Sequence, residues 1–219
     1  MKQDTFWQRF TTVYRQLKML IWPFAVVLAG ILVFRFLYGR EDIYFYINRL
    51  HTSWGDTFFP YITELGSTGA AVAITIVLFL VNRRAGFMMA TAYTFTSLVN
   101  FTLKFLVAFP RPHRYFEHRL QEIYFVPGVT VLDNFRSFPS GHSVCAFTAA
   151  TLLSYYVKNK YWSWLFLVLA SLVAYSRMYM SQHFLEDVTA GATEAILLTM
   201  LWLTFIKGKG YAAAMDTGL

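Results

Sequence analysis

The sequence is poor in charged residues and in cysteine, and each shortage excludes a class of protein. Asp, Glu, Lys and Arg make up 14% of the 219 residues, whereas hydrophobic types make up 57% and aromatic types 19%. Soluble domains usually carry about 25% charged residues, so an ordinary soluble surface is excluded. Cys145 is the single cysteine, which excludes an internal disulfide. The composition therefore predicts a chain that folds within a lipid bilayer.

Acidic residues are also scarce, with 12 Asp and Glu against 19 Lys and Arg, a formal net charge of +7. A basic excess can indicate nucleic-acid binding, but here no soluble domain carries a basic stripe with interleaved aromatic residues. The five histidines do not form an HExxH pattern, and no paired Asp cluster accompanies them, which disfavours a metallohydrolase. We expect no nucleic-acid partner, no metal and no cofactor.

Six apolar segments are candidates for membrane-spanning helices, each of which needs about 20 mostly apolar residues. They are Met19–Tyr38, Ser67–Val81, Gly86–Phe105, Ser140–Val157, Tyr161–Tyr175 and Asp187–Ile206. The second and fifth are short, so their helices must extend back toward Tyr61 and on to Ser176. The predicted fold is all-α, a six-span transmembrane helical bundle forming a single domain over 1–219, with cytoplasmic segments at 1–18 and 207–219.

The distribution of basic residues favours a cytoplasmic N-terminus. With this orientation ten Lys and Arg lie in inner segments and nine in outer ones. Three of the nine, Lys104, Arg111 and Arg177, belong to motifs described below, which leaves six outer against ten inner residues. Short inner connections suit a bacterial inner membrane with both termini cytoplasmic. The longer outer segments, Gly39–Gly66 and Phe109–Phe138, are expected to be partly helical and interfacial, on the periplasmic side.

The tetrapeptide Pro139–His142 precedes a long apolar run. Ser140 is a typical N-cap, so a helix is predicted to begin here with free backbone N–H groups, which favour an anion. Gly141 allows a ligand to approach the backbone closely, and His142 stands beside it. Taken alone, the tetrapeptide is equally compatible with an ordinary helix start that carries an interfacial histidine.

His183 and Asp187 are four residues apart and would share one face of a helix. The carboxylate can then accept the ring N–H of His183, which leaves the other ring nitrogen free to attack phosphorus. A structural pair at a helix start is the alternative, but ionisable groups this close to a membrane span favour a functional role.

Three cations are expected at the same membrane level as the two histidines. Lys104 ends an apolar segment, Arg111 lies between two prolines, and Arg177 precedes His183 by six positions. A snorkelling side chain would explain Lys104 alone. Together the three cations can offset the charge of a phosphoryl transition state, and arginine matches phosphate oxygens in two-point contacts.

The three motifs, Lys-x6-Arg-Pro, Pro-Ser-Gly-His and Ser-Arg-x5-His-x3-Asp, resemble the signature motifs of the type 2 phosphatidic acid phosphatase family, whose site is similar to that of vanadium haloperoxidases. The resemblance implies that His183 attacks phosphorus to give a phosphohistidine, that Asp187 orients it, and that His142 protonates the leaving oxygen. The phosphate-binding residues that it implies are Lys104, Arg111, Ser140, Gly141 and Arg177. The expected function is metal-independent hydrolysis of a lipid phosphate or pyrophosphate.

The motifs bind only the phosphoryl group, so several substrates stay open: undecaprenyl pyrophosphate, phosphatidylglycerophosphate, phosphatidic acid and the phosphates of lipid A. A lipid phosphotransferase would use the same motifs. A non-catalytic lipid-binding or transport protein is less consistent with them, because it has no use for a His–Asp pair and a second histidine. The sequence does not indicate an oligomeric state.

Further polar residues lie outside the motifs. The candidates for headgroup binding in the outer segment are His113, Arg114, Arg119 and Arg136, although a loop facing anionic lipid would explain them equally well. Glu194 lies seven residues after Asp187 within the last apolar segment. There it is either a hydrogen-bonded packing residue or a partner of the site.

Overall fold

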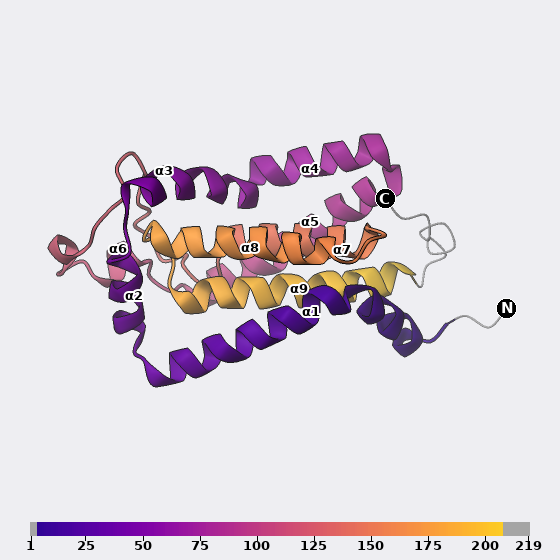
Figure 1. Ribbon diagram of the computed structural model, residues 1–219, viewed down its shortest axis with the longest axis horizontal. Coiled ribbons are helices and arrows are strands. Elements are labelled where there is room, and N and C mark those ends of the chain that lie inside the picture. Colours follow the sequence, from indigo (N-terminus) through magenta and orange to yellow (C-terminus); the bar gives the residue numbers. More distant parts are fainter. Residues whose placement is uncertain (1–3, 208–219) are drawn as a thin grey trace.

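The computed structural model describes residues 4–207, which fold into a bundle of helices (Figure 1). The long elements are α1 (Phe6–Leu37), α4 (Thr68–Val81), α5 (Arg83–Val107), α7 (Gly141–Tyr156), α8 (Trp162–Tyr179) and α9 (Leu185–Lys207). The short ones are α2 (Arg40–Asn48), α3 (Ser53–Ile62), η1 (Thr63–Gly66), α6 (Pro112–Tyr115) and η2 (Leu120–Glu122). Residues 4–207 contain no strand, which confirms the all-α prediction. Apart from Lys207, the predicted tail 207–219 lies outside the described residues.

The first helix, α1, starts within the polar segment 1–18 that precedes the first apolar segment. Thr5 and Gln8 form a capping box, in which the Gln8 side chain accepts the Thr5 N–H at 2.7 Å and the Thr5 hydroxyl accepts the Gln8 N–H at 3.3 Å. Val13 and Leu17 are fully buried against the core. The segment 1–18 is thus helical from Phe6 onward, because it contains its own N-cap and its own stripe of buried apolar side chains.

Three helical stretches of the described chain are long and apolar enough to cross a membrane: Phe6–Leu37, Arg83–Tyr115 and Leu185–Ile206. A fourth is added if Ser53–Gly66 and Thr68–Val81, which meet at a bend of 54°, count as one span. These stretches make the chain an integral membrane protein. The count of six spans stays a prediction, since α7 has 16 residues and α4 has 14.

The two short predicted spans extend differently. α8 continues through Ser176 to Tyr179, as a crossing requires. α4 does not continue toward Tyr61 as one α-helix, because the Ser67 hydroxyl accepts the Ala70 N–H at 3.2 Å and caps its start. The 3-10 turn η1 and the separate helix α3 precede it instead, at an angle of 54° to α4.

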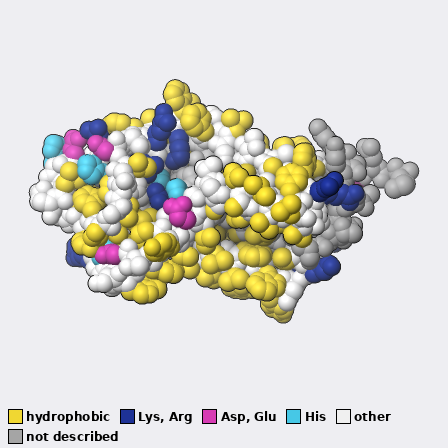
Figure 2. Space-filling view, turned by 90° about the horizontal axis from the view of Figure 1, so that it is seen from above, with side chains coloured by type: hydrophobic (Ala, Val, Ile, Leu, Met, Phe, Trp, Pro, Cys, Tyr) yellow, Lys and Arg dark blue, Asp and Glu magenta, His cyan; other side chains and the backbone are white. Residues whose placement is uncertain are grey.

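Helix α7 forms the centre of the bundle. Eleven of its 16 residues are buried, and small side chains such as Ala146, Ala149 and Ala150 allow neighbouring helices to approach closely. The outer faces of the bundle expose large apolar side chains, for example Phe36 and Leu80 at 90% and 83% exposure. Figure 2 shows hydrophobic side chains covering the middle of one face, as expected for a surface that contacts lipid.

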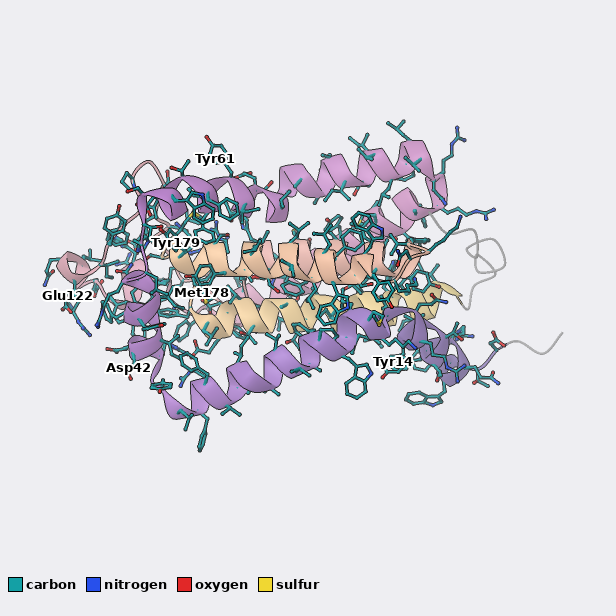
Figure 3. The ribbon with its side chains drawn as sticks, in the orientation of Figure 1. Tyr14, Asp42, Tyr61, Glu122, Met178 and Tyr179 are labelled. Carbon is teal, nitrogen blue, oxygen red and sulfur yellow. The ribbon has the colours of Figure 1, made fainter. Side chains whose placement is uncertain are left out.

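The helix directions bring the three motifs to one end of the bundle. The end of α5, the start of α7, the end of α8 and the start of α9 all lie at the left in Figure 1, beside α2, α3 and α6. Met178 and Tyr179 of α8 mark this end in Figure 3, and Tyr14 of α1 marks the opposite one. The co-location predicted from the order of the spans is therefore present in the fold.

Candidate active site

The chain after α5 folds back against the segment that precedes the second motif. Ala108, with a left-handed φ of 46°, ends α5 by donating its N–H to the Lys104 carbonyl at 3.2 Å. Next, the Arg111 N–H donates to Asn134 O at 3.0 Å, and the Ser137 N–H donates to Phe109 O at 3.0 Å. These two backbone bonds place Arg111 and Ser137 side by side at the end of α5.

The second motif starts α7 as predicted. The Ser140 hydroxyl accepts the Ser143 N–H at 3.4 Å, which confirms the N-cap. The Ser140 N–H donates to the Asp187 carbonyl at 2.9 Å, so the second motif is bonded directly to the third. Helix α9 packs tightly here, because a Cβ at Gly191 would lie 2.6 Å from the Ser140 carbonyl oxygen. A glycine is required where the two backbones come this close.

His183 lies in the turn between α8 and α9 with only 2% of its surface exposed. Its Nδ1 is 3.4 Å from Asp187 Oδ2 and 3.4 Å from Ser137 Oγ. Its Nε2 is 3.2 Å from Nη1 of Arg111. One ring nitrogen therefore faces the carboxylate and the other faces the cations, which is the arrangement expected for a nucleophilic histidine.

The surroundings of His183 favour its neutral form. Burial is the main cause that holds its pKa well below the usual value, and Arg111, Arg177, Lys104 and His142 add electrostatic opposition to a protonated ring. At neutral pH the ring can carry one proton on Nδ1, toward Asp187, and a lone pair on Nε2, which accepts a hydrogen bond from Arg111 Nη1. Such a lone pair is what attack on an electrophile requires.

The Asp187 carboxylate is held by more than His183. Its Oδ2 accepts the Ser137 hydroxyl at 2.5 Å and the Phe184 N–H at 2.9 Å. Both contacts are shorter than the 3.4 Å that separates it from His183. The carboxylate is thus fixed in place before it acts on the imidazole.

Two buried arginines flank the histidine, each with 7% exposure. Arg111 donates from Nη1 to the Gln182 carbonyl at 2.9 Å and from Nε to Asn134 Oδ1 at 3.1 Å. Arg177 donates from Nη1 to the Thr63 hydroxyl at 3.0 Å. A guanidinium has five N–H donors, so both arginines keep donors for phosphate oxygens.

Potential metal ligands do not cluster in the described part of the chain. Residues 4–207 contain no group of three or more His, Cys, Asp or Glu side chains placed to hold a metal ion.

Lys104 and Glu194 lie on the α5 side of the site. Lys104 donates to the Arg136 carbonyl at 2.9 Å, and its Cε is 3.8 Å from the position of a Cβ at Gly141. Glu194 accepts a hydrogen bond from Asn100 Nδ2 at 3.2 Å. The side-chain oxygen of Asn100, Oδ1, in turn lies 3.5 Å from the same Gly141 position. Glu194 is therefore connected to the turn at Gly141 through Asn100.

Several polar partners of the site carry no signal in the sequence. Ser137 and Asn134 stand in a loop without a recognisable pattern, and Thr63 comes from η1, 114 positions away from Arg177. Their contacts depend on how the outer segments fold back over the helix ends. Sequence reasoning could identify them only through covariation between distant positions.

The four candidate headgroup cations differ in their partners. Three of them have carboxylates nearby. His113 is 3.7 Å from Asp133, and Arg114 is 3.0 Å from Asp133 and 3.4 Å from Glu117. Arg119 is 3.0 Å from Glu41 and 2.8 Å from Glu122. Arg136 forms no ion pair within the described part of the chain, and its guanidinium lies 6.0 Å from the centre of the Phe101 ring.

Comparisons with known proteins identify the family to which the chain belongs. The family model described as the PAP2 superfamily matches residues 84–211. The crystal structure of LpxE from Aquifex aeolicus is similar, with a TM-score of 0.65 and 28% identity over 74% of this chain and 93% of that one. A transmembrane PAP2-type phosphatidylglycerolphosphate phosphatase from Bacillus subtilis has a TM-score of 0.59 and 24% identity, over 93% of this chain and 98% of that one. A search of curated proteins finds no match.

Proposed function

Because the chain belongs to the PAP2 superfamily, we propose that it hydrolyses a lipid phosphate or lipid diphosphate through a phosphohistidine at His183. The family model covers more than half of the chain, and the chain is a membrane-embedded enzyme of the lipid phosphatase class. What goes beyond the class is the mechanism, the role of each residue and the choice of substrate.

The orientation of His183 is the observation that carries the proposal. Nδ1 points to the fixed carboxylate of Asp187, and Nε2 points to Arg111. A buried histidine kept only for packing would not need an unprotonated nitrogen directed at an arginine. In the proposed reaction a phosphate binds between these cations and places its phosphorus next to Nε2.

The first chemical step transfers the phosphoryl group to the enzyme. The Nε2 lone pair of His183 attacks phosphorus, the bond from phosphorus to the leaving oxygen breaks, and His142 gives its proton to that oxygen. Asp187 stabilises the positive charge that develops on the ring through Nδ1–H. Proton transfer of this kind typically contributes about 10²–10⁴-fold to the rate.

The second step returns the enzyme to its starting state. Water attacks the phosphohistidine, His142 takes a proton from that water, and the bond between phosphorus and Nε2 breaks to release inorganic phosphate. Throughout, Lys104, Arg111 and Arg177 would hold the phosphoryl oxygens, together with Ser140 and the backbone N–H groups at Gly141. In this proposal the groups need little reorganisation when the substrate binds, which lowers the barrier.

We infer that the site faces the periplasmic side of a bacterial inner membrane, because the excess of Lys and Arg lies in the opposite segments. A lipid phosphate then reaches it from the outer leaflet. The structural relative from Bacillus subtilis is a phosphatidylglycerolphosphate phosphatase, so that lipid belongs in the substrate panel with phosphatidic acid, undecaprenyl pyrophosphate and lipid A.

The test is phosphate release by the purified full-length protein in detergent and EDTA across this panel. Wild type is expected to release phosphate and to form an acid-labile phosphoprotein, and His183→Ala should lose both. His118→Ala is the matched control, since His118 is 93% exposed on the outer side, and it should retain both. Orthovanadate, a mimic of the transition state, should inhibit.

Substantial turnover by His183→Ala would refute the nucleophile assignment. A phosphotransferase would instead need an acceptor, so addition of a lipid alcohol would yield a new lipid phosphate in place of inorganic phosphate. That outcome would keep the histidine chemistry and replace hydrolysis by transfer.

A further inference from the structure

Arg136 differs from Arg114 and Arg119, the other two arginines among the headgroup candidates, because it has no carboxylate partner within the described residues. Arg114 and Arg119 each pair with two carboxylates, whereas Arg136 forms no ion pair within residues 4–207. Its side chain is exposed. A neutralised cation contributes little to binding a further anion, while an unpaired one keeps its full charge for a ligand.

The backbone of Arg136 is held by the phosphate-binding cations themselves. Its carbonyl accepts the Lys104 ammonium at 2.9 Å. Its N–H donates to Asn134 Oδ1 at 3.0 Å, and the same oxygen accepts the Arg111 Nε at 3.1 Å. The Arg136 side chain therefore starts from a backbone that is fixed to the site on both sides.

The guanidinium lies where the site meets lipid. It is 6.0 Å from the ring centre of Phe101, a residue of α5 that is 59% exposed. Figure 2 shows basic side chains and a histidine gathered on one face, where the hydrophobic band begins. Arg136 is also on the Lys104 side of the site: Lys104, whose ammonium binds the Arg136 carbonyl, has its Cε 3.8 Å from the position of a Cβ at Gly141, the residue before His142.

In the proposed reaction the leaving group departs toward His142, the general acid. A lipid monophosphate leaves as an uncharged alcohol, which has no use for another cation. A lipid diphosphate leaves as a lipid monophosphate, whose charge lies directly beside the scissile bond. An arginine at this place can form charge-assisted hydrogen bonds to that phosphate.

We propose that Arg136 binds a second phosphate of the substrate, the one that stays on the lipid, and that the enzyme consequently prefers lipid diphosphates to lipid monophosphates. This inference rests on the proposed function. In the proposed reaction on a diphosphate, His183 attacks the terminal phosphorus, and the bond from that phosphorus to the bridging oxygen breaks. His142 then protonates the bridging oxygen, which stays on the departing lipid monophosphate.

The test compares two substrates with the same tail, farnesyl diphosphate and farnesyl monophosphate, using full-length protein in detergent with EDTA. Wild type is expected to favour the diphosphate in kcat/KM. Arg136→Gln should lower kcat/KM for the diphosphate about tenfold or more, the size expected for loss of a hydrogen bond between charged groups, and should change the monophosphate value less than about twofold.

Two further variants control the comparison. Arg49→Gln removes an exposed arginine from the end of α2, on the same side of the membrane, so it matches the change in surface charge and should leave both substrates unaffected. Arg136→Lys keeps the charge but not the planar fork, and should restore part of the diphosphate preference. Thermal unfolding of each variant establishes that the fold is intact.

Equal losses on both substrates in Arg136→Gln, or no loss on either, would overturn the second-phosphate site. The proposed function fails by a different result, namely hydrolysis of neither lipid by wild type, or turnover of the monophosphate that survives His183→Ala. The two failures are therefore distinguishable within one set of measurements.

Discussion

Replacing Gly191 by alanine should separate catalysis from stability. Gly191 lies one helical turn after Asp187 on α9, where that helix crosses the start of α7. An added Cβ would lie 2.6 Å from the Ser140 carbonyl oxygen, 3.4 Å from the Ser140 nitrogen and 3.2 Å from Ser143 Cβ. Two of these three atoms are backbone atoms, which cannot rotate away, so the helices themselves must move apart.

The size of the movement follows from the contact. Ordinary van der Waals contact with a Cβ begins at 3.4 Å, so α9 must shift by 3.4 minus 2.6, or about 0.8 Å, relative to α7. Overpacking of this kind costs about 1–3 kcal/mol, and the better helix propensity of alanine over glycine returns about 1 kcal/mol. The net loss of stability is then about 0–2 kcal/mol, too small to unfold the protein.

Catalysis should respond far more strongly. Asp187 and its Ser140 partner are bonded backbone to backbone at 2.9 Å across this crossing, so the shift separates the histidine from the phosphate-binding turn. A misplacement of about 1 Å can cost about 10²-fold in rate. We expect kcat for Gly191→Ala to fall about 10²-fold, while the unfolding temperature changes by only a few degrees.

The assay is kcat for phosphate release together with thermal unfolding in the same detergent. Gly30→Ala is the matched control, because Gly30 is also within a helix and a Cβ there would meet nothing within 4 Å. It should keep wild-type activity. A Gly191→Ala protein that stays within about threefold of wild-type kcat would refute the argument that this close approach sets the geometry of the site.

Two other expectations concern buried polar groups. Glu194→Leu should lower the free energy of unfolding by about 1–3 kcal/mol, because the Asn100 side chain loses the carboxylate that accepts its hydrogen bond. Glu194→Gln keeps a side-chain carbonyl at that place and should stay near wild type. Equal unfolding temperatures for the two variants would contradict this expectation. The pKa of His183 is lowered in the folded protein, so this side chain stays unprotonated there. In the unfolded chain the same side chain takes up a proton below about pH 6.5. The free energy of unfolding should therefore fall as the pH decreases below that value. Thermal unfolding from pH 8 to pH 5 measures the trend, and His183→Gln should have a shallower slope than wild type.

Local interactions account for the features that were predicted correctly from the sequence. The Ser140 cap and the start of α7 depend on residues three positions apart, and the extension of α8 to Ser176 continues a segment without Gly or Pro. The apolar segments follow from composition alone. The start of α1 at Phe6 was not predicted, because an overall polar lead obscured the buried stripe formed by Val13 and Leu17.

The lipid phosphatase class could also be predicted from the sequence, since the residues proposed as nucleophile, acid and phosphate-binding cations stand in motifs of recognisable order. Their convergence at one end of the bundle followed from the alternation of helix direction. What the motifs could not indicate was the support around them. Ser137 holds Asp187, and Thr63 holds Arg177, through contacts between segments that are 50 and 114 positions apart.

The sequence by itself thus determined the all-helical membrane class and the cap at Ser140, because these properties depend on composition and on neighbours within about one helical turn. Only the tertiary structure decided which polar groups meet. Within residues 4–207, Arg114 and Arg119 lie next to carboxylates and Arg136 does not, although all three are outer-segment arginines in the sequence. The physical reason is that an ion pair requires two side chains within about 4 Å, and that distance is set by how distant segments pack.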